Sequence, residues 1–213
     1  MTKRVTYLAS AASLALAAIF ASTAQAAYTQ TYEEVGGNVV EVGMGTLNTT
    51  DLTDLGSPFS ETAAVGPAGG TSISGSITGA PVEFFSGLSD PGPFGPGIQT
   101  DANSSSGDIV GVQGANGEPS AFLFTPAGYV SGASLSETMT FDGATFASLG
   151  VTPGEYVFTW GTGASADTFT VDFATSGAAP EPATWAMMLI GFAGLSYAAA
   201  RRKSAAPSNV QIG

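Results

Sequence analysis

The sequence contains no cysteine and no histidine. Without Cys there is no disulfide, no thiol nucleophile and no zinc-thiolate site, and without His no imidazole can activate a serine. All 5 Lys and Arg residues lie near the ends of the chain, at positions 3, 4 and 201–203. Residues 27–179 therefore hold no positive side chain, but they hold every one of the 17 acidic residues except Glu181. No salt bridge can form there, so these carboxylates must be solvated, hydrogen-bonded to backbone amides or bound to cations.

These absences narrow the possible functions. Nucleic-acid binding needs Lys and Arg to neutralise phosphates, and adsorption to anionic lipid headgroups needs them too, so we expect no nucleic-acid partner. An enzyme would have to work with carboxylates and hydroxyls alone, which leaves a two-carboxylate glycosidase as an alternative. The sequence singles out no pair of acids for that role. We therefore expect no catalytic residue, no metal and no cofactor.

The amino terminus has the pattern of a secretory signal peptide. Lys3 and Arg4 precede an apolar, alanine-rich run over residues 5–20, which leads into Ala24-Gln25-Ala26. Ala24 and Ala26 fit an Ala-x-Ala cleavage site, with Ala27 as the first mature residue. A permanent membrane anchor is the alternative, but the apolar run is short and ends in a cleavable sequence. We therefore expect signal peptidase and the export machinery as partners.

Residues 27–179 show the pattern of an all-β domain. Gly and Pro recur throughout, and apolar residues fall in short runs with alternation or β-branched composition rather than at helical spacing. About eight strands at this spacing predict a single β-sandwich-like domain. The expected strands cover residues 38–44, 71–78, 108–113, 120–124, 136–141, 155–160 and 167–173.

The last two of these strands form the clearest hairpin. Tyr156, Phe158 and Trp160 alternate onto one face of the first strand, as Phe169 and Phe173 do on the second. Aromatic side chains on one strand face usually point inward, so we expect core packing here. The alternative is a sugar-stacking platform, which would need these rings to be exposed.

Residues 86–106 are expected to form a long loop, ordered by its prolines rather than by a core. Asp101, Asn103 and Ser105 alternate as they do in a calcium-binding loop. However, Val112 stands where that loop needs its bidentate Glu. We therefore expect a solvated loop rather than a calcium site.

A second apolar segment lies near the carboxyl end. Ala183 to Ala200 carries no charge, and as a helix these residues would span about 27 Å, close to the thickness of a hydrocarbon core. A core helix of this length would be expected to carry charges on its outer face. Arg201, Arg202 and Lys203 follow as a basic stop that belongs on the cytoplasmic side. We therefore predict a transmembrane helix, with everything before Pro180 outside.

The carboxy-terminal segment resembles the PEP-CTERM sorting domain in its PEPxxWA variety. The resemblance rests on Pro180-Glu181-Pro182, Trp185-Ala186, Gly191-Phe192 and the basic stop; Ser196 replaces a usual glycine, and the tail after the stop is longer than usual. It implies a bacterial surface protein, held until an exosortase, a membrane-embedded cysteine transpeptidase, processes the Pro-Glu-Pro region. Pro180, Glu181 and Pro182 would then be substrate. The two prolines keep Glu181 extended and accessible to a protease-like groove.

A further stretch is similar to one that often precedes this anchor in uncharacterised PEP-CTERM proteins. It comprises residues 149–154, Tyr156, Trp160-Gly161 and Asp167-Thr168-Phe169. The similarity implies a shared β-domain and no known chemistry.

The sequence thus predicts an all-β domain flanked by an N-terminal signal helix and a C-terminal transmembrane helix. The segments are a signal peptide (1–26), an extracytoplasmic β-rich domain (27–179), a sorting signal (180–203) and a short cytoplasmic tail (204–213). The chain would be exported across the inner membrane, anchored transiently, and then placed at the surface or outside the cell. Our leading hypothesis is a structural protein of the extracellular matrix or biofilm with exopolysaccharide as a partner, and the alternative is a carbohydrate-binding module.

Overall fold

The computed structural model describes residues 27–56, 59–115 and 120–174. The expected signal peptide, the apolar segment from Ala183 to Ala200 and the tail lie outside these residues. Within the described part of the chain, no helix has both the length and the apolar character needed to cross a membrane.

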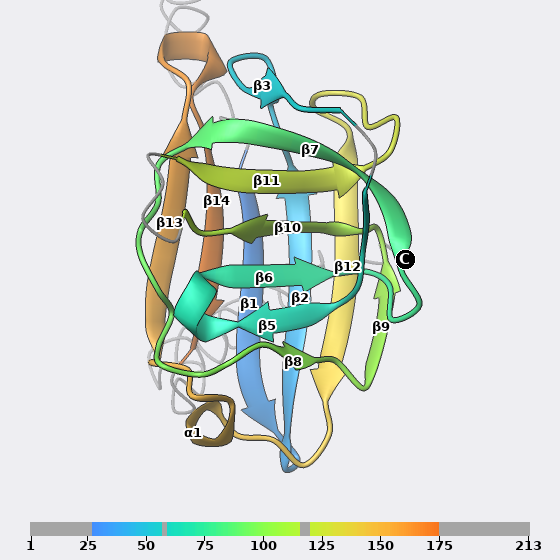
Figure 1. Ribbon diagram of the computed structural model, residues 1–213, viewed down its shortest axis with the longest axis vertical. Helices are drawn as coiled ribbons and strands as arrows, with labels where there is room; N and C mark the ends of the chain where they lie inside the picture. The colour runs from blue at the N-terminus through green and yellow to red at the C-terminus, as the bar shows by residue number, and fades with distance from the viewer. Residues whose placement is uncertain (1–26, 57–58, 116–119, 175–213) are drawn as a thin grey trace, which may run out of the picture. The chain divides into compact units, whose positions relative to one another are not determined.

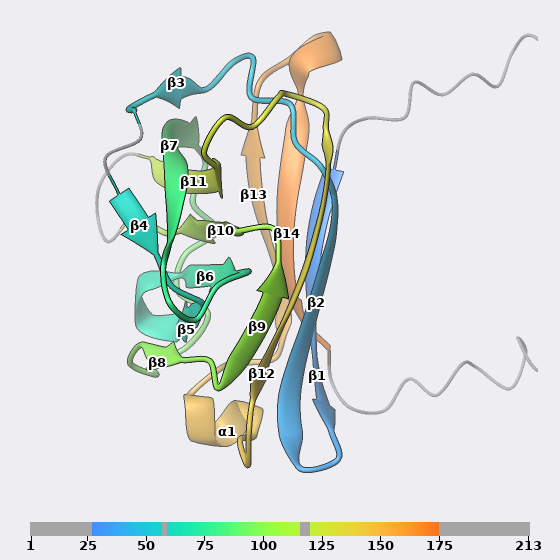
Figure 2. The ribbon, with the colours of Figure 1, turned by 90° about the vertical axis from the view of Figure 1, so that its right-hand side faces the viewer.

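The described residues form two β-sheets that face each other, which confirms the all-β prediction (Figures 1 and 2). The first sheet has the order β13 (Gly154–Trp160), β14 (Asp167–Phe173), β1 (Ala27–Val35), β2 (Asn38–Thr46), β12 (Ser134–Phe141) and β9 (Ser104–Gly107). The second has the order β3 (Thr53–Asp54), β7 (Ala80–Leu88), β11 (Ala121–Pro126), β10 (Val110–Gln113), β6 (Thr71–Ser74), β5 (Ala64–Gly66) and β8 (Thr100–Asp101), with β4 (Phe59–Glu61) also paired to β7. In Figure 1 the strands of the second sheet run across those of the first, as they do in orthogonal sheet packing.

Helical structure is limited to short turns in the described residues. These are α1 (Phe146–Leu149) and two 3-10 turns, Pro67–Gly69 and Gly163–Ser165. Thr145 caps α1 by accepting a hydrogen bond from the Ser148 backbone N–H, and the Ser148 hydroxyl accepts one from the Thr145 backbone N–H in return. This capping box holds the turn that leads from β12 to β13.

Each of the seven expected strands corresponds to a strand in the structure. The bounds of β14 are as expected, and the other six have one or both ends shifted. The expected strand over residues 71–78 ends at Ser74, because Gly75 has φ +108° and lies against the Asp108 backbone. A Cβ at Gly75 would lie 2.1 Å from the Asp108 carbonyl oxygen, so this bend requires glycine. The predicted hairpin is β13–β14, with Phe158 opposite Phe169.

Strand β1 does not appear among the expected strands, yet it lies near the centre of the first sheet. It pairs in parallel with β14, with Tyr28 opposite Phe169, and antiparallel with β2, with Glu33 opposite Val40. Ala27, the expected first mature residue, opens this strand.

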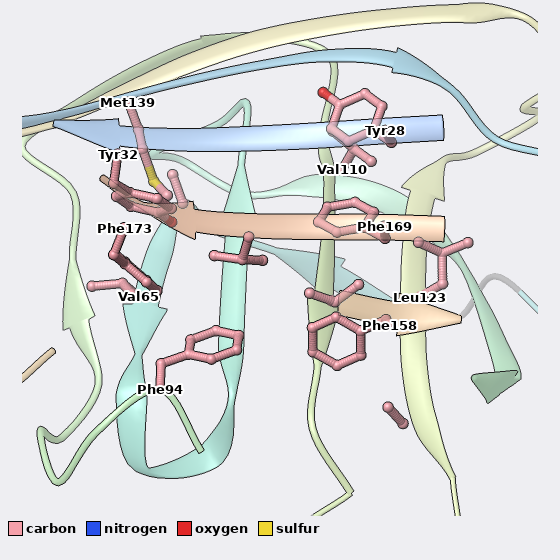
Figure 3. Close-up of a cluster of buried hydrophobic side chains, with 14 of the residues drawn as sticks. Tyr28, Tyr32, Val65, Phe94, Val110, Leu123, Met139, Phe158, Phe169 and Phe173 are labelled. Carbon is pink, nitrogen blue, oxygen red and sulfur yellow. The ribbon is translucent and has the colours of Figure 1, made fainter. Parts of the chain in front are cut away.

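Aromatic side chains of the first sheet and of a loop pack against aliphatic side chains of the second sheet between the layers (Figure 3). Tyr28 stacks on Phe169 with ring centroids 5.0 Å apart, and Tyr32 contacts Phe173 at 4.4 Å. From the second sheet, Val65, Val110 and Leu123 close the same cluster. This apolar contact is the main source of the domain's stability, since cysteine is absent.

The segment 86–106 differs from the loop that we expected. Its ends belong to strands β7 and β9, and β8 lies within it. Phe94 is fully buried, and its ring lies 4.8 Å from Tyr156 and 5.5 Å from Phe173. Its backbone N–H donates to Pro67 O at 2.8 Å, and its carbonyl accepts from Thr152 N at 2.7 Å. The expectation of a loop without a core was therefore wrong, because Phe94 anchors the segment in the main core.

Several acidic side chains hold the loops by accepting hydrogen bonds from backbone N–H groups. This is one of the three environments expected for carboxylates in a domain without positive side chains. The Asp90 carboxylate accepts from Gly92 N at 2.9 Å and from Ala115 N at 2.8 Å. Further bonds of this kind link Asp54 to Gly56, Glu83 to Gly128, Glu34 to Phe146, Asp108 to Ser136 and Asp167 to Asn48. Such charge-assisted bonds are stronger than those between neutral groups.

The core position of Phe94 gives a direct test. We expect Phe94→Ala to lower the free energy of unfolding by about 3–5 kcal/mol, because it leaves a cavity among aromatic rings. The matched control is Ile98→Ala in the same segment, since Ile98 is 81% exposed, and its effect should stay within about 0.5 kcal/mol. Urea unfolding of the purified chains measures both, and equal effects would contradict the anchoring role.

Candidate functional site

The residues expected to act in sorting lie outside the described part of the chain. They are Ala24 and Ala26 of the signal cleavage site, Pro180, Glu181, Pro182 and Trp185 of the sorting motif, and Arg201, Arg202 and Lys203 of the stop. Within the described residues, the chemically distinctive groups are a set of buried polar side chains, three anchored aromatic residues and an exposed face of the first sheet.

The buried polar side chains lie between the two sheets. Strand β1 contributes Gln30, β2 contributes Glu41, β12 contributes Glu137, and β6 of the opposite sheet contributes Ser72 and Ser74. Gln30, Glu41, Ser72 and Ser74 are fully buried, and Glu137 is 5% exposed. We call these five residues the buried polar network.

Glu137 occupies space that a glycine leaves open. It lies opposite Gly43 on β2, where a Cβ would come within 1.9 Å of Glu137 Oε1. The Glu137 carboxyl group accepts a hydrogen bond from the Tyr28 hydroxyl and a second from Gln30 Nε2 at 3.0 Å. Gly43 thus allows the acid to lie flat against the sheet and to reach its two donors on β1.

Glu41 is less completely satisfied. Its Oε2 accepts from the Ser74 hydroxyl at 2.8 Å, whereas Oε1 is buried with no hydrogen-bond partner among the described residues. Glu41 pairs with Met139 in the β2–β12 ladder, so Glu137 is its diagonal neighbour. The two acids therefore form a pair on adjacent strands of one inner face.

Burial changes the acidity of both carboxyl groups. Desolvation raises the pKa of Glu41 from 4.5 to about 8, while hydrogen bonds from Ser74 and from the Met139 backbone lower it. Desolvation likewise raises the pKa of Glu137 from 4.5 to about 8. The pKa of Tyr32 is also raised, first by burial and then by the nearby Glu41. At neutral pH the two acids are thus mainly protonated and hydrogen-bonded rather than charged.

Tyr129, Tyr156 and Trp160, which a sugar-stacking platform would expose, act as structural anchors instead. Trp160 is 5% exposed and donates from Nε1 to Asn48 O at 2.7 Å. The Tyr129 hydroxyl donates to Ala133 O at 2.7 Å, and the Tyr156 hydroxyl donates to Thr152 O at 2.9 Å. The predicted core packing is confirmed for Trp160, whereas Tyr156 is partly buried and packs against the core.

The outer face of β1 and β2 forms a groove of about 430 Å³. Its lining residues are Thr29, Thr31, Glu33, Val35, Val40, Val42 and Met44. Met44 is 63% exposed and Val42 is 45% exposed, and the lining contains no aromatic ring. The groove therefore lacks the ring surface on which sugars usually stack.

A half-exposed group of phenylalanines lies on the second sheet. Phe59 is 50% exposed and meets Phe84 edge-on at 5.7 Å, and Phe84 stacks on Phe122 at 4.8 Å. Pattern reasoning missed this group because β4 and β7 were not expected as strands. Among the described residues, this group is the aromatic surface that most resembles a sugar-stacking platform.

The residues of the calcium-like pattern are used in strand pairing. Asp101 lies in β8 opposite Ala64, and Asn103 Oδ1 accepts from Asp142 N at 2.8 Å. Ser105 lies in β9 and donates to Thr138 O at 2.9 Å. Within the described residues, no three Asp or Glu side chains are grouped as metal ligands.

Comparison with known proteins assigns the carboxy-terminal segment. A family model described as the PEP-CTERM protein-sorting motif matches residues 178–203. No curated protein and no solved structure shows a significant match to the chain. The chain thus carries a carboxy-terminal motif of the kind that sorts exported proteins. It is a PEP-CTERM sorting domain-containing protein, and the partner that its motif implies is an exosortase.

The contact between Gly43 and Glu137 can be tested by mutation. We expect Gly43→Ala to lower the free energy of unfolding by about 1–3 kcal/mol, because the new methyl group displaces Glu137 from its donors. Met44→Ala, at the exposed next position, is the control. In a Glu137→Ala background, the added cost of Gly43→Ala should largely disappear in a double-mutant cycle measured by urea unfolding. A cost that persists would mean that Glu137 is not the obstructing group.

Proposed function

We propose that the chain is a structural protein of the extracellular matrix, delivered there by exosortase processing of its Pro180-Glu181-Pro182 motif. The single observation that carries the proposal is the sorting motif at residues 178–203, which follows directly on the β-domain. On this proposal, signal peptidase cleaves before Ala27, and the segment from Ala183 to Ala200 holds the chain in the membrane until it is processed. Arg201, Arg202 and Lys203 then remain on the cytoplasmic side.

The β-domain supports a structural role rather than a catalytic one. A glycosidase needs two carboxyl groups at a cleft that a sugar can enter. Among the described residues, the carboxyl pair that the fold brings together between the sheets is Glu41 and Glu137, and both are buried. We therefore propose that the domain is not an enzyme.

A carbohydrate-binding module is the second candidate. Tyr129, Tyr156 and Trp160 do not favour it, since their polar atoms are bonded to the backbone. The half-exposed group of Phe59, Phe84 and Phe122 is the observation that keeps it open. Electrophoresis in gels that contain polysaccharide tests this candidate. Slower migration of the purified chain that is lost in Phe59→Ala and kept in Val130→Ala would favour it. Val130 is the matched exposed control.

The sorting step has a decisive experiment. We expect intact-mass measurement on envelope and medium fractions to find a species that runs from Ala27 to the Pro180-Glu181-Pro182 region only in cells that contain the exosortase. Glu181→Ala should block formation of this species, and Glu155→Ala, an exposed acid in the domain, should not. A chain that keeps its tail to Gly213 in both strains would reduce the carboxy-terminal segment to a simple anchor.

The matrix role predicts a dependence on divalent cations. Because residues 27–179 carry acids and no bases, contact with other anionic polymers requires bridging cations to offset the repulsion. We expect a calcium chelator to release the protein from isolated matrix and added calcium to restore its retention. Fractionation followed by mass measurement reports both. Retention that is indifferent to calcium and to salt would contradict cation bridging while leaving the sorting step intact.

A further inference from the structure

The buried polar network connects the two sheets directly. Gln30 Oε1 on β1 accepts from the Ser72 hydroxyl on β6 at 2.6 Å, and the Tyr32 hydroxyl also bonds to Ser72. Glu41 on β2 accepts from Ser74 on β6. Gln30 in turn donates to Glu137 on β12. Two separate sets of hydrogen bonds thus tie three strands of the first sheet to β6. One runs from Ser72 through Gln30 to Glu137, and the other joins Ser74 to Glu41.

None of the described residues is positively charged, so hydrogen-bond donors alone can stabilise a negative charge on the two acids. Strand β1 presents the phenols of Tyr28 and Tyr32, β6 presents the hydroxyls of Ser72 and Ser74, and β9 places Gly107 opposite Glu137. Residues 27–179 contain no Lys, Arg or His. An ionised Glu41 would in addition keep Oε1 without a donor. A charge buried without a partner is strongly destabilising, so the neutral carboxyl is the form that this site accommodates.

We propose that the buried polar network is a proton-controlled lock between the two sheets, closed while Glu41 and Glu137 carry protons and released when they ionise. The domain is then tightest under mildly acidic conditions and loosens as its surroundings become alkaline. The sorting motif has no part in this behaviour, so the lock is independent of the proposed matrix role.

The direction of the pH dependence follows from proton linkage. Each carboxyl has a pKa of about 8 in the folded domain and an ordinary value of 4.5 when exposed. Between these values the folded state binds more protons than the unfolded state, so stability falls as pH rises. The contribution is complete below pH 4.5 and is lost as pH rises through about 8. For two independent groups the folding equilibrium constant falls up to about 100-fold per pH unit in this window, and for one group about 10-fold.

Urea unfolding between about pH 5 and 8.5 tests the lock, over the window in which linkage applies. We expect the wild-type chain to show the steep fall, Glu41→Gln and Glu137→Gln each to show a shallower one, and the double variant to lose most of it. Gln resembles a protonated Glu in shape and cannot ionise. Glu33→Gln is the control, because it makes the same substitution at an exposed glutamate of the same sheet. The control should keep the wild-type slope, which separates the lock from general repulsion among the acids.

A second measurement needs no variant to fold. In the wild-type chain labelled with ¹³C at the glutamate carboxyl groups, two resonances should titrate near pH 8. Two such late resonances, together with a flattened slope in the double variant, support the lock. The proposal is overturned if every glutamate titrates near its ordinary value, or if the double variant folds and keeps the wild-type slope.

Discussion

The absence of positive charge from residues 27–179 is the constraint on which the domain depends. An acid in most proteins can pair with Lys or Arg, but here that choice does not exist. The carboxylates of Asp90, Asp108 and Asp167 instead accept backbone N–H groups and fix the ends of loops. The same shortage makes the interior acids neutral, since an unpaired buried charge would cost more than a marginally stable domain can tolerate.

The space between the sheets combines two kinds of contact with different roles. The aromatic cluster around Phe94, Phe169 and Phe173 supplies apolar burial, which is strong but tolerant of small shifts. The buried polar network is directional, because Gln30 and Glu41 reach their serine partners only in one register of β1 and β2 against β6. A one-residue slip of either strand would turn these side chains toward solvent. The network thus selects one arrangement of the sheets that the aromatic contacts then stabilise.

Destination and domain are encoded in separate parts of this chain. The sorting motif is recognisable from about 25 contiguous residues, because it is a local sequence pattern. In the described part of the β-domain, the buried Glu41 and Glu137 accept hydrogen bonds from neighbouring side chains. This division fits the role proposed here, in which the sorting signal determines the destination of the protein and the acidic domain is the part delivered to the matrix.

The sequence by itself determined the all-β class, the β13–β14 hairpin with its inward aromatic face, and the sorting motif, because each depends on residues that are close together in the chain. It did not indicate strand β1, whose inward face mixes Tyr28 and Tyr32 with the polar Gln30 and so hides the apolar alternation. It also did not show that the Phe94 side chain of a proline-rich segment is buried in the core, or that Glu41 and Glu137 are buried. Only the tertiary structure decided these, because Ser74 lies 33 residues from Glu41, and Tyr28 and Gln30 lie 109 and 107 residues from Glu137. The free energy of burying an acid depends on such distant partners, which no local pattern specifies.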